Sequence, residues 1–232
     1  MATTSKPRAR PRVAKATSRR AGRPAGAGPD QRERLLDAAT ACFARNGIAA
    51  TSLRAIADEA GVNPALLHYY FGDKAQLQDA MVEERVMPAF GALRDSLQAH
   101  GEEAAGLIAG FVRGVGDVVA RHPWLPALWV REVLCEGGAL RSLMLERLAP
   151  QMPQMLAARF DAAQRAGQLN PDLDPRLLVV SLVGLTLFPA AGAPIWRQMF
   201  DAGDLDADAM RDHTIALLDG GLGLATAGKD PA

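Results

Sequence analysis

The side chains best placed for chemistry in this chain are a group of polar and aromatic residues that lie close together in the sequence. Asn63, His68, Tyr69 and Lys74 fall within one short stretch, and such polar and aromatic side chains contact bases and phosphates. The groups that catalysis or metal binding needs do not converge: the histidines have no ligand spacing, and no Gly-rich phosphate loop follows a strand. We therefore expect no catalytic site, no metal and no cofactor. The histidines are His68, His100, His122 and His213.

The segment that carries these residues predicts two short helices joined by a tight turn. Thr51 or Ser52 can cap the first helix by accepting a backbone hydrogen bond. Gly61 follows the last periodic residue, where a left-handed conformation is easiest for a residue without Cβ. Between this cap and Gly61, apolar residues at i, i+3, i+4 and i+7 predict the buried face of the first helix. It consists of Leu53, Ile56, Ala57 and Ala60.

The second helix is expected from about residue 64 to residue 70. Asn63 is its predicted N-cap, and Pro64 stands at the first helical position, where its missing N–H costs nothing. Leu67 and Phe71 should point inward at i and i+4, which leaves aromatic side chains facing outward. Such a helix is better suited to a DNA groove than to solvent. The alternative is a small helical hairpin with a few surface aromatics. The outward positions are Ala65, Leu66, His68, Tyr69 and Tyr70.

With these residues in view, the segment resembles the DNA-binding domain of TetR/AcrR-type transcriptional repressors over about 50 residues. The resemblance implies an all-α chain with an N-terminal three-helix helix-turn-helix domain and a C-terminal helical domain for ligand binding and dimerisation. Asn63-Pro64-Ala65 and Leu66-Leu67-His68 depart from the usual residues, which affects the base preference rather than the fold. The matching residues are 35–47 (LLDAATACFARNG), Thr51-Ser52, Ile56-Ala57, Ala60-Gly61-Val62, Tyr69-Tyr70-Phe71, Lys74 and Leu77.

The resemblance also implies which residues contact DNA. Arg54 can make a bidentate contact to guanine or phosphate, whereas Lys74 is a point charge suited to phosphate. Arg54 is alternatively a solvated surface arginine, and His68 can instead pack against Tyr69 or the following helix. The expected DNA-binding residues are Ser52, Arg54, Asn63, Pro64, Ala65, His68, Tyr69, Tyr70 and Lys74.

The zero net charge hides an uneven distribution. Residues 1–29 carry eight basic and no acidic residues, so the remainder has 26 − 8 = 18 basic against 26 acidic residues. The arm is rich in Pro, Ala, Gly and Ser, which predicts disorder, and its charge favours salt-sensitive phosphate binding. Gly22-Arg23-Pro24 resembles the core of a minor-groove hook, although a generic solvated tail or a targeting peptide has a similar composition.

The sequence predicts four segments: a disordered basic arm (1–29), a helix-turn-helix domain (30–76), a helical ligand-binding and dimerisation domain (77–225) and a flexible tail (226–232). Pro88 is expected to kink or end the helix that joins the two domains. The first helix is expected at about 30–46, ended by Gly47. Further helices are expected at about 102–121, 124–135, 140–166, 175–190 and 207–224.

Aromatic and methionine side chains in the second domain are candidates for an apolar ligand cavity. Ordinary core packing is the alternative for each of them. Three carboxylates there, Asp117, Glu132 and Glu136, would balance a cationic ligand if buried, but exposed helix carboxylates are commoner. The predicted ligand-binding residues are Phe111, Trp124, Trp129, Met152 and Phe160, with Met144 and Met155 as further candidates.

A single two-turn reading helix gives little specificity, so a homodimer is expected. The last two helices are its predicted interface, with burial inside one subunit as the alternative. The apolar run 177–189 is interpreted as too short to span a bilayer, and Cys42 and Cys135 suggest no oxidising compartment, which indicates a cytoplasmic protein. The candidate interface residues are Leu177, Leu178, Val180, Ser181, Gly184, Leu185, Phe188, Leu217, Leu218 and Leu222.

The resemblance, together with these patterns, implies a ligand-responsive repressor that binds a palindromic operator as a dimer. A small, mainly apolar inducer would release it by favouring a second conformational state. The competing hypothesis is a ligand-independent nucleoid protein, which would bind random DNA nearly as well as any operator. An enzyme is the least favoured class.

Overall fold

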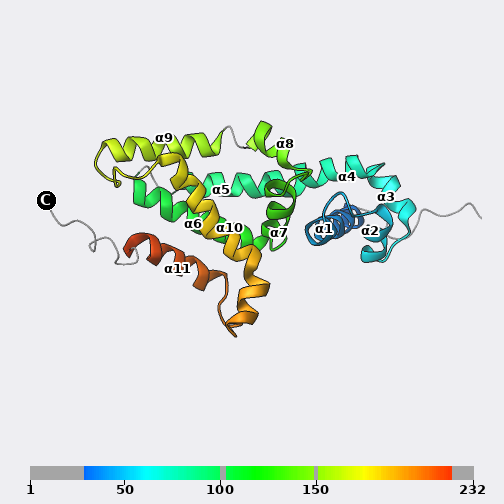
Figure 1. Ribbon diagram of the computed structural model, residues 1–232. Helices are drawn as coiled ribbons and strands as arrows, with labels where there is room; N and C mark the ends of the chain where they lie inside the picture. The colour runs from blue at the N-terminus through cyan, green and yellow to red at the C-terminus, as the bar shows by residue number, and fades with distance from the viewer. Residues whose placement is uncertain (1–28, 100–102, 149–150, 221–232) are drawn as a thin grey trace, which may run out of the picture.

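The computed structural model describes residues 29–99, 103–148 and 151–220, and every regular element in those ranges is a helix. Figure 1 shows an elongated molecule with a small group of helices at one end, which we call the head. The all-α prediction is confirmed. Residues 1–28 of the arm predicted at 1–29 and the tail at 226–232 lie outside the described residues, and Pro29 is the first residue of α1. The head comprises α1 (Pro29–Asn46), α2 (Leu53–Ala60) and α3 (Pro64–Phe71).

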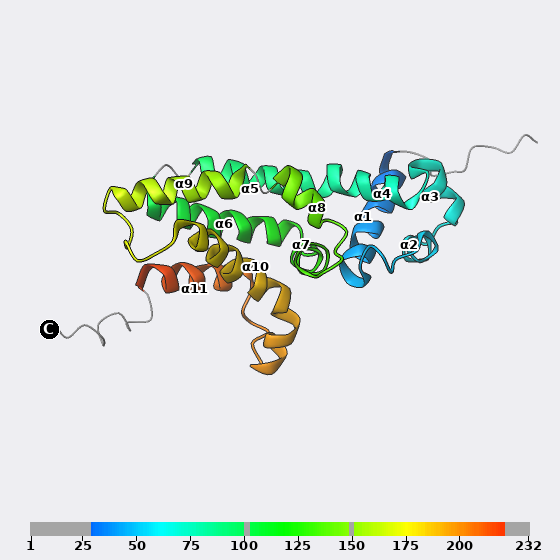
Figure 2. The ribbon, with the colours of Figure 1, turned by 45° about the horizontal axis from the view of Figure 1, so that its top comes forward.

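One long connecting helix starts at the head and extends along the remaining helices toward the opposite end of the molecule (Figure 2). It consists of α4 (Lys74–Met81), a wider π-helical turn η1 (Val82–Val86) and α5 (Met87–Ala99). Pro88 does not end this helix, because the wide turn η1 directly precedes it. A proline cannot donate to the carbonyl four residues earlier, and here the Arg85 side chain donates to the Glu84 carbonyl oxygen at 3.0 Å.

The remaining helices pack beside α5 and form what we call the sensor body. Helices α5 and α6 lie side by side, and α9, α10 and α11 pack around α6 (Figures 1 and 2). The elements are α6 (Ala104–Arg121), α7 (Leu125–Trp129), η2 (Val130–Leu134), α8 (Arg141–Leu143), η3 (Met144–Leu148), α9 (Met152–Arg165), α10 (Pro175–Met199) and α11 (Ala207–Gly220).

Two expected helix boundaries were wrong. The helix expected at 140–166 is divided into α8 with η3 and a separate α9, which has Pro153 in its first turn. Helix α10 does not end near residue 190 but continues to Met199 through Pro189 and Pro194. The Trp196 indole N–H donates to the Pro189 carbonyl oxygen at 2.8 Å, which is a side-chain contact within α10 that spans Pro194.

The described residues contain two apolar cores. The first fills the head, and it also takes in Leu128 and Leu140 from the sensor body. The second fills the sensor body around Leu107, Leu156 and Phe160. The two parts therefore share apolar packing at their junction. We expect movement of α7 to be transmitted to the head because its side chains belong to the head's core.

Helix α10 is unusually exposed for its composition. By length and hydropathy alone it qualifies as a candidate membrane span, with 17% of its most apolar window buried. The apolar run 177–189 is too short to span a bilayer by itself, but the helix of 25 residues that contains it is long enough. A continuous exposed apolar helix face needs a covering surface of some kind.

Candidate DNA-reading face, domain junction and ligand pocket

The predicted turn between α2 and α3 is confirmed in its details. The Ser52 hydroxyl oxygen accepts a hydrogen bond from the Ala55 N–H at 3.1 Å, so Ser52 is the cap. Thr51 is buried instead, and its hydroxyl donates to the Gly47 carbonyl oxygen at 2.6 Å. Gly61 adopts the left-handed conformation with φ 66°. Asn63 then caps α3 by accepting from the Ala65 N–H at 2.9 Å.

Helix α3 turns an aromatic face to solvent. Leu67 and Phe71 are buried in the head's core, as expected from their spacing. Tyr69 is 70% exposed, and its ring meets the Tyr70 ring edge-on, with centroids 5.1 Å apart. An exposed tyrosine on a short, well-capped helix is a rigid surface for contacting base edges or backbone.

The polar side chains near α3 differ in whether they already form hydrogen bonds within the protein. Arg54 is exposed and has no hydrogen-bond or ion-pair partner within the described ranges. The Lys74 ammonium donates to the Ala49 carbonyl oxygen at 3.0 Å, which holds it beside the head. His68 Nδ1 lies 2.7 Å from the Gly72 carbonyl oxygen. Since a carbonyl can only accept, Nδ1 carries the hydrogen, and the ring turns toward the end of its own helix.

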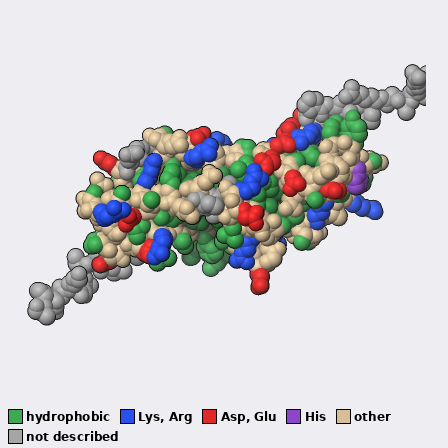
Figure 3. All heavy atoms as spheres, turned by 90° about the horizontal axis from the view of Figure 1, so that it is seen from above, with side chains coloured by type: hydrophobic (Ala, Val, Ile, Leu, Met, Phe, Trp, Pro, Cys, Tyr) green, Lys and Arg blue, Asp and Glu red, His purple; other side chains and the backbone are tan. Residues whose placement is uncertain are grey.

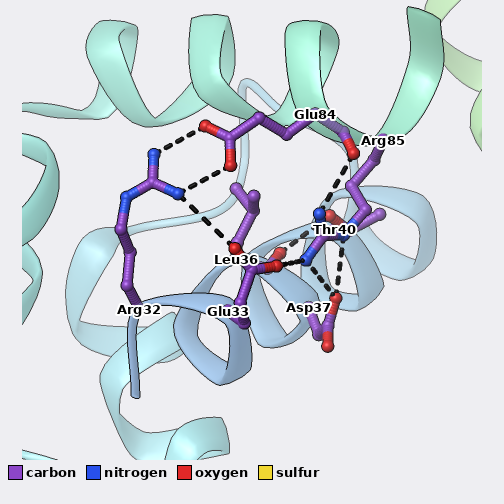
Figure 4. A network of polar contacts seen from close by, with 7 residues as sticks. All are labelled: Arg32, Glu33, Leu36, Asp37, Thr40, Glu84 and Arg85. Carbon is purple, nitrogen blue, oxygen red and sulfur yellow. Dashed lines mark hydrogen bonds and ion pairs between the residues drawn. The ribbon is translucent and has the colours of Figure 1, made fainter. Parts of the chain in front are cut away.

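Ion pairs tie α1 to η1 (Figure 4). Both Arg32 terminal nitrogens donate to the Glu84 carboxylate at 2.6 Å, and this pairing lowers the pKa of Glu84. Arg85 reaches Glu33 at 2.6 Å and Asp37 at 2.9 Å. The guanidinium of Arg32 also lies 4.9 Å from the centre of the buried Phe71 ring. A shift of η1 would therefore reach α1 and the end of α3.

A buried carboxylate joins the sensor body to the head. Glu132, on η2, is only 4% exposed. One carboxylate oxygen accepts from the Ile48 N–H of the head at 2.8 Å, and the other accepts from the Ala139 N–H at 2.9 Å. At Gly47 a Cβ would lie 3.1–3.2 Å from atoms of Arg131 and Glu132, so a glycine lets η2 approach the α1–α2 loop.

The sequence offered Glu132 only as one of three carboxylates that would suit a cationic ligand. Its two partners are backbone N–H groups, one of them 84 residues away. A buried charged acceptor with two donors is well satisfied. Glu132 is therefore a contact between the two parts of the chain, and no side-chain pattern near it in sequence indicates this.

Among its described residues, the sensor body contains a wide pocket, a second one of about 280 Å³ beside α10, and smaller hollows. The wide pocket, of about 630 Å³, lies between α5, η3 and the start of α9. On the face of the molecule in Figure 3, apolar side chains are visible between charged ones of both signs. The wide pocket is lined by Met87, Phe90, Gly91, Arg94, Gln98, Glu146, Arg147, Gln151, Met152 and Met155.

The predicted ligand-binding residues are separated by the structure. Met152 and Met155 line the wide pocket, and Trp129 lines two small apolar hollows and a larger one of about 280 Å³. Phe111 and Phe160 are buried in the second core, and Trp124 packs against both cores. Phe90 and Arg147 had not been singled out in the sequence.

The three π-helical turns meet at one small apolar hollow. Val86 of η1, Val133 of η2 and Met144 of η3 all line it. π-Helical turns are rare, and they occur frequently at functional sites. This hollow adjoins Phe90, which also lines the wide pocket. The backbone irregularities are thus concentrated between the pocket and the head.

Comparison with known proteins agrees with this arrangement. Residues 35–81 match the family described as bacterial regulatory proteins, tetR family, and residues 107–219 match the family described as tetracyclin repressor-like, C-terminal domain. A curated relative, the HTH-type transcriptional repressor SCO4008 of Streptomyces coelicolor, is 27% identical over 179 residues, which cover 77% of this chain and 88% of that protein.

Solved structures share the fold over most of the chain. The ketosteroid transcriptional regulator KstR2 of Mycobacterium tuberculosis superposes with a TM-score of 0.69 at 23% identity, covering 84% of this chain and 96% of that one. The regulator FadR of Bacillus subtilis, solved in complex with stearoyl-CoA, gives a TM-score of 0.61 at 19% identity, covering 82% and 98%. With matches to both halves and a helix-turn-helix of the expected geometry, this chain belongs to the TetR family of DNA-binding transcriptional regulators.

Proposed function

We propose that the protein is a cytoplasmic repressor that binds a palindromic operator as a homodimer and is released by a small, mainly apolar molecule. The capped α3 helix with its exposed Tyr69 is the observation that carries the DNA-binding part of this proposal. The curated relative named above, itself a repressor, supports the sign of regulation. The proposed DNA-binding domain is residues 30–76, which contain the head apart from Pro29, and the proposed ligand-binding and dimerisation domain begins at residue 77.

The proposed DNA contacts fall into two classes. Arg54, Lys74 and the N-terminal end of α3 serve the phosphates or an edge base, whereas Ala65 and Tyr69 face outward toward base edges. The hydrogen bond from His68 to the Gly72 carbonyl leaves its other ring nitrogen as the atom available to DNA. Ser52, Asn63, Pro64 and Tyr70 complete the proposed contact surface.

The homodimer is proposed to form through α10 and α11. Large apolar side chains recur along one face of α10 at spacings of three, four and seven residues, which is the pattern of a helix that packs against another helix. Phe188 on this face is 70% exposed. A Cβ on Gly184 would meet nothing within 4 Å, so that position leaves room for a partner helix. The exposed residues of the face are Leu177, Val180, Gly184, Phe188, Ile195 and Met199.

A footprint on the promoter next to the gene, followed by competition with random DNA, tests the function. A repressor should protect an operator-sized palindrome and prefer it to random DNA by a factor of about 10³ or more. Equal binding to random DNA would favour the ligand-independent nucleoid protein instead. A folded dimer that protects no sequence would contradict the repressor.

The dimer is tested with Val180→Glu, which places a charge on the exposed apolar face without disturbing a buried side chain. We expect a monomer in analytical ultracentrifugation with the helical content of the wild type, and loss of operator binding because one head reads only a half-site. Leu173→Glu, an exposed leucine outside α10, is the matched control. A Val180→Glu protein that remains dimeric would remove α10 from the interface.

A further inference from the structure

The wide pocket combines an apolar lining with two arginine side chains, each of which faces an acidic residue outside the lining: Arg94 faces Asp95 and Arg147 faces Glu83. Arg94 of α5 and Arg147 of η3 contribute two guanidinium groups, whereas Glu146 contributes one carboxylate. Met87, Phe90, Met152 and Met155 supply most of the apolar lining. Its volume of about 630 Å³ falls in the range of roughly 300–1,000 Å³ that is typical of small-molecule sites. Guanidinium groups bind carboxylates and phosphates through paired hydrogen bonds.

Arg147 already has a partner, and that partner lies on the connecting helix. Its Nη1 donates to Glu83 Oε1 at 2.6 Å, and the two side chains are 47% and 54% exposed. Exposed ion pairs of this kind are held weakly. An anion bound in the pocket would offer Arg147 alternative acceptor oxygens at the cost of a weak contact only.

Glu83 is the first of three consecutive charged residues on η1. It points to the sensor body through Arg147, whereas the next two residues, Glu84 and Arg85, bind α1 of the head (Figure 4). The same turn of helix thus touches the pocket on one side and the head on the other. Losing Arg147 would remove this ion pair between η1 and the sensor body while the ion pairs of η1 with α1 remain.

A buried polar atom without a partner among the described residues lies at small hollows that share Phe90 with the wide pocket. Phe90 lines the wide pocket and also two small apolar hollows that reach Trp129, and the two rings lie 6.1 Å apart. The Trp129 Nε1 is buried and has no acceptor among the described residues. A buried donor without a partner is costly in a finished core, but it suits a site that a ligand completes.

We propose that the wide pocket binds an amphipathic acid whose anionic group takes Arg147 from Glu83 and whose apolar body lies against Phe90 and Met152. This inference rests on the proposed ligand-responsive function and names the chemical class of the ligand. It also names the step by which binding reaches the head: exchange of one ion pair on η1.

Dodecanoate is a suitable probe, with dodecan-1-ol and dodecyltrimethylammonium as chain-matched neutral and cationic comparisons. Calorimetry on the full-length protein should give tighter binding for dodecanoate than for dodecan-1-ol by about tenfold, because one charge-assisted contact is added. The ammonium compound should bind more weakly than either. Fluorescence anisotropy on the footprinted promoter should show release of DNA by dodecanoate.

Variants separate the exchange from simple apolar binding. Arg147→Met should lower dodecanoate affinity by about tenfold and leave dodecan-1-ol affinity unchanged. Glu83→Gln should raise dodecanoate affinity, because the competing carboxylate is gone, and should weaken DNA binding without any ligand. Arg165→Met is the matched control, since Arg165 is an exposed α9 arginine paired with Asp161 outside the pocket.

Three results would overturn the inference: no dodecanoate binding, equal binding of acid and alcohol, or unchanged dodecanoate affinity in Arg147→Met. Calorimetry requires no operator, so these results are obtained even if no promoter is protected. A protected operator together with any of them would leave the repressor intact and exclude the acidic ligand. Unchanged ligand-free DNA binding in Glu83→Gln would refute the exchange step.

Discussion

The head and the sensor body use their apolar side chains in different ways. In the head, large apolar residues such as Phe43, Ile56 and Leu67 are fully buried, and Tyr69 on the proposed reading face is the one large hydrophobic side chain classed as exposed among the described head residues. The sensor body buries Phe160 just as completely, but it leaves Phe188 and its neighbours on α10 exposed. The head covers its apolar side chains by packing within itself and against the junction, whereas the sensor body leaves an apolar helix face exposed.

The junction belongs to both regions. Leu128 and Leu140 of the sensor body lie in the head's core, and Glu132 accepts the Ile48 N–H of the head. The π-helical turns lie on the sensor side and on the connecting helix, and α1–α3 contain none. A closely packed head with irregular neighbours favours transmission by rigid-body movement of the head over deformation within it.

The largest expected difference between the regions is in their tolerance of cavities. Phe43→Ala removes a fully buried ring from the head and should lower the free energy of unfolding by about 3–5 kcal/mol. Phe90→Ala removes a half-buried ring that already borders a pocket and should cost roughly half as much. Urea denaturation at one fixed protein concentration measures both, because dimer dissociation makes stability depend on concentration. Equal losses would contradict the contrast between the two regions.

A smaller effect is expected at the junction. Glu132→Gln replaces one carboxylate oxygen by an amide NH₂, which cannot accept from either Ile48 or Ala139, so one of these two backbone N–H groups loses its partner. We expect a loss of about 1–3 kcal/mol in the free energy of unfolding, with operator affinity reduced because the α1–α2 loop is held less firmly.

The exposed neighbour Glu136→Gln is the matched control and should change neither quantity measurably. If Glu132→Gln lowers stability but leaves both operator affinity and its response to ligand unchanged, Glu132 only anchors the loop. If it changes neither stability nor binding, the two backbone hydrogen bonds contribute nothing net.

The head was predictable because the residues that form it act locally. Ser52, Gly61 and Asn63 each set a cap or turn within three residues of themselves, and the spacing of Leu67 and Phe71 determines which face of α3 is buried. Such signals can be recognised in a single sequence. The proposed DNA contacts follow from that face and remain predictions.

The sensor body was less predictable because its decisive contacts join distant residues. Glu132 and Ile48 are 84 residues apart, and Arg147 and Glu83 are 64 apart. The helix expected at 175–190 in fact continues through Pro189 and Pro194 to Met199, and the Trp196 side chain that contacts the Pro189 carbonyl lies beyond the expected end. Local patterns show that these helices are apolar but not which surfaces meet.

The smallest predicted effect compares the two contacts of η1 and depends on pH. Arg32 donates to Glu84 and lowers its pKa, so the ionised form is favoured in the folded protein. Its contribution is present above the ordinary carboxyl pKa of about 4.3 and is lost as pH falls through the lower folded value. The Glu84 side chain is 35% exposed, so Glu84→Gln should cost only about 1 kcal/mol or less near pH 7. The difference in free energy of unfolding between wild type and Glu84→Gln, measured by urea denaturation, should stay constant from pH 7 to pH 5 and shrink below pH 5.

Glu83→Gln, which loses the contact with the sensor body instead, is the control for removing one charge from η1. A difference that persists undiminished well below pH 4 would mean that the Glu84 side chain stabilises the head by packing rather than by its charge. The contact of η1 with α1 would then not be an ion pair in its effect on stability, unlike the role proposed for the contact of Glu83 with Arg147.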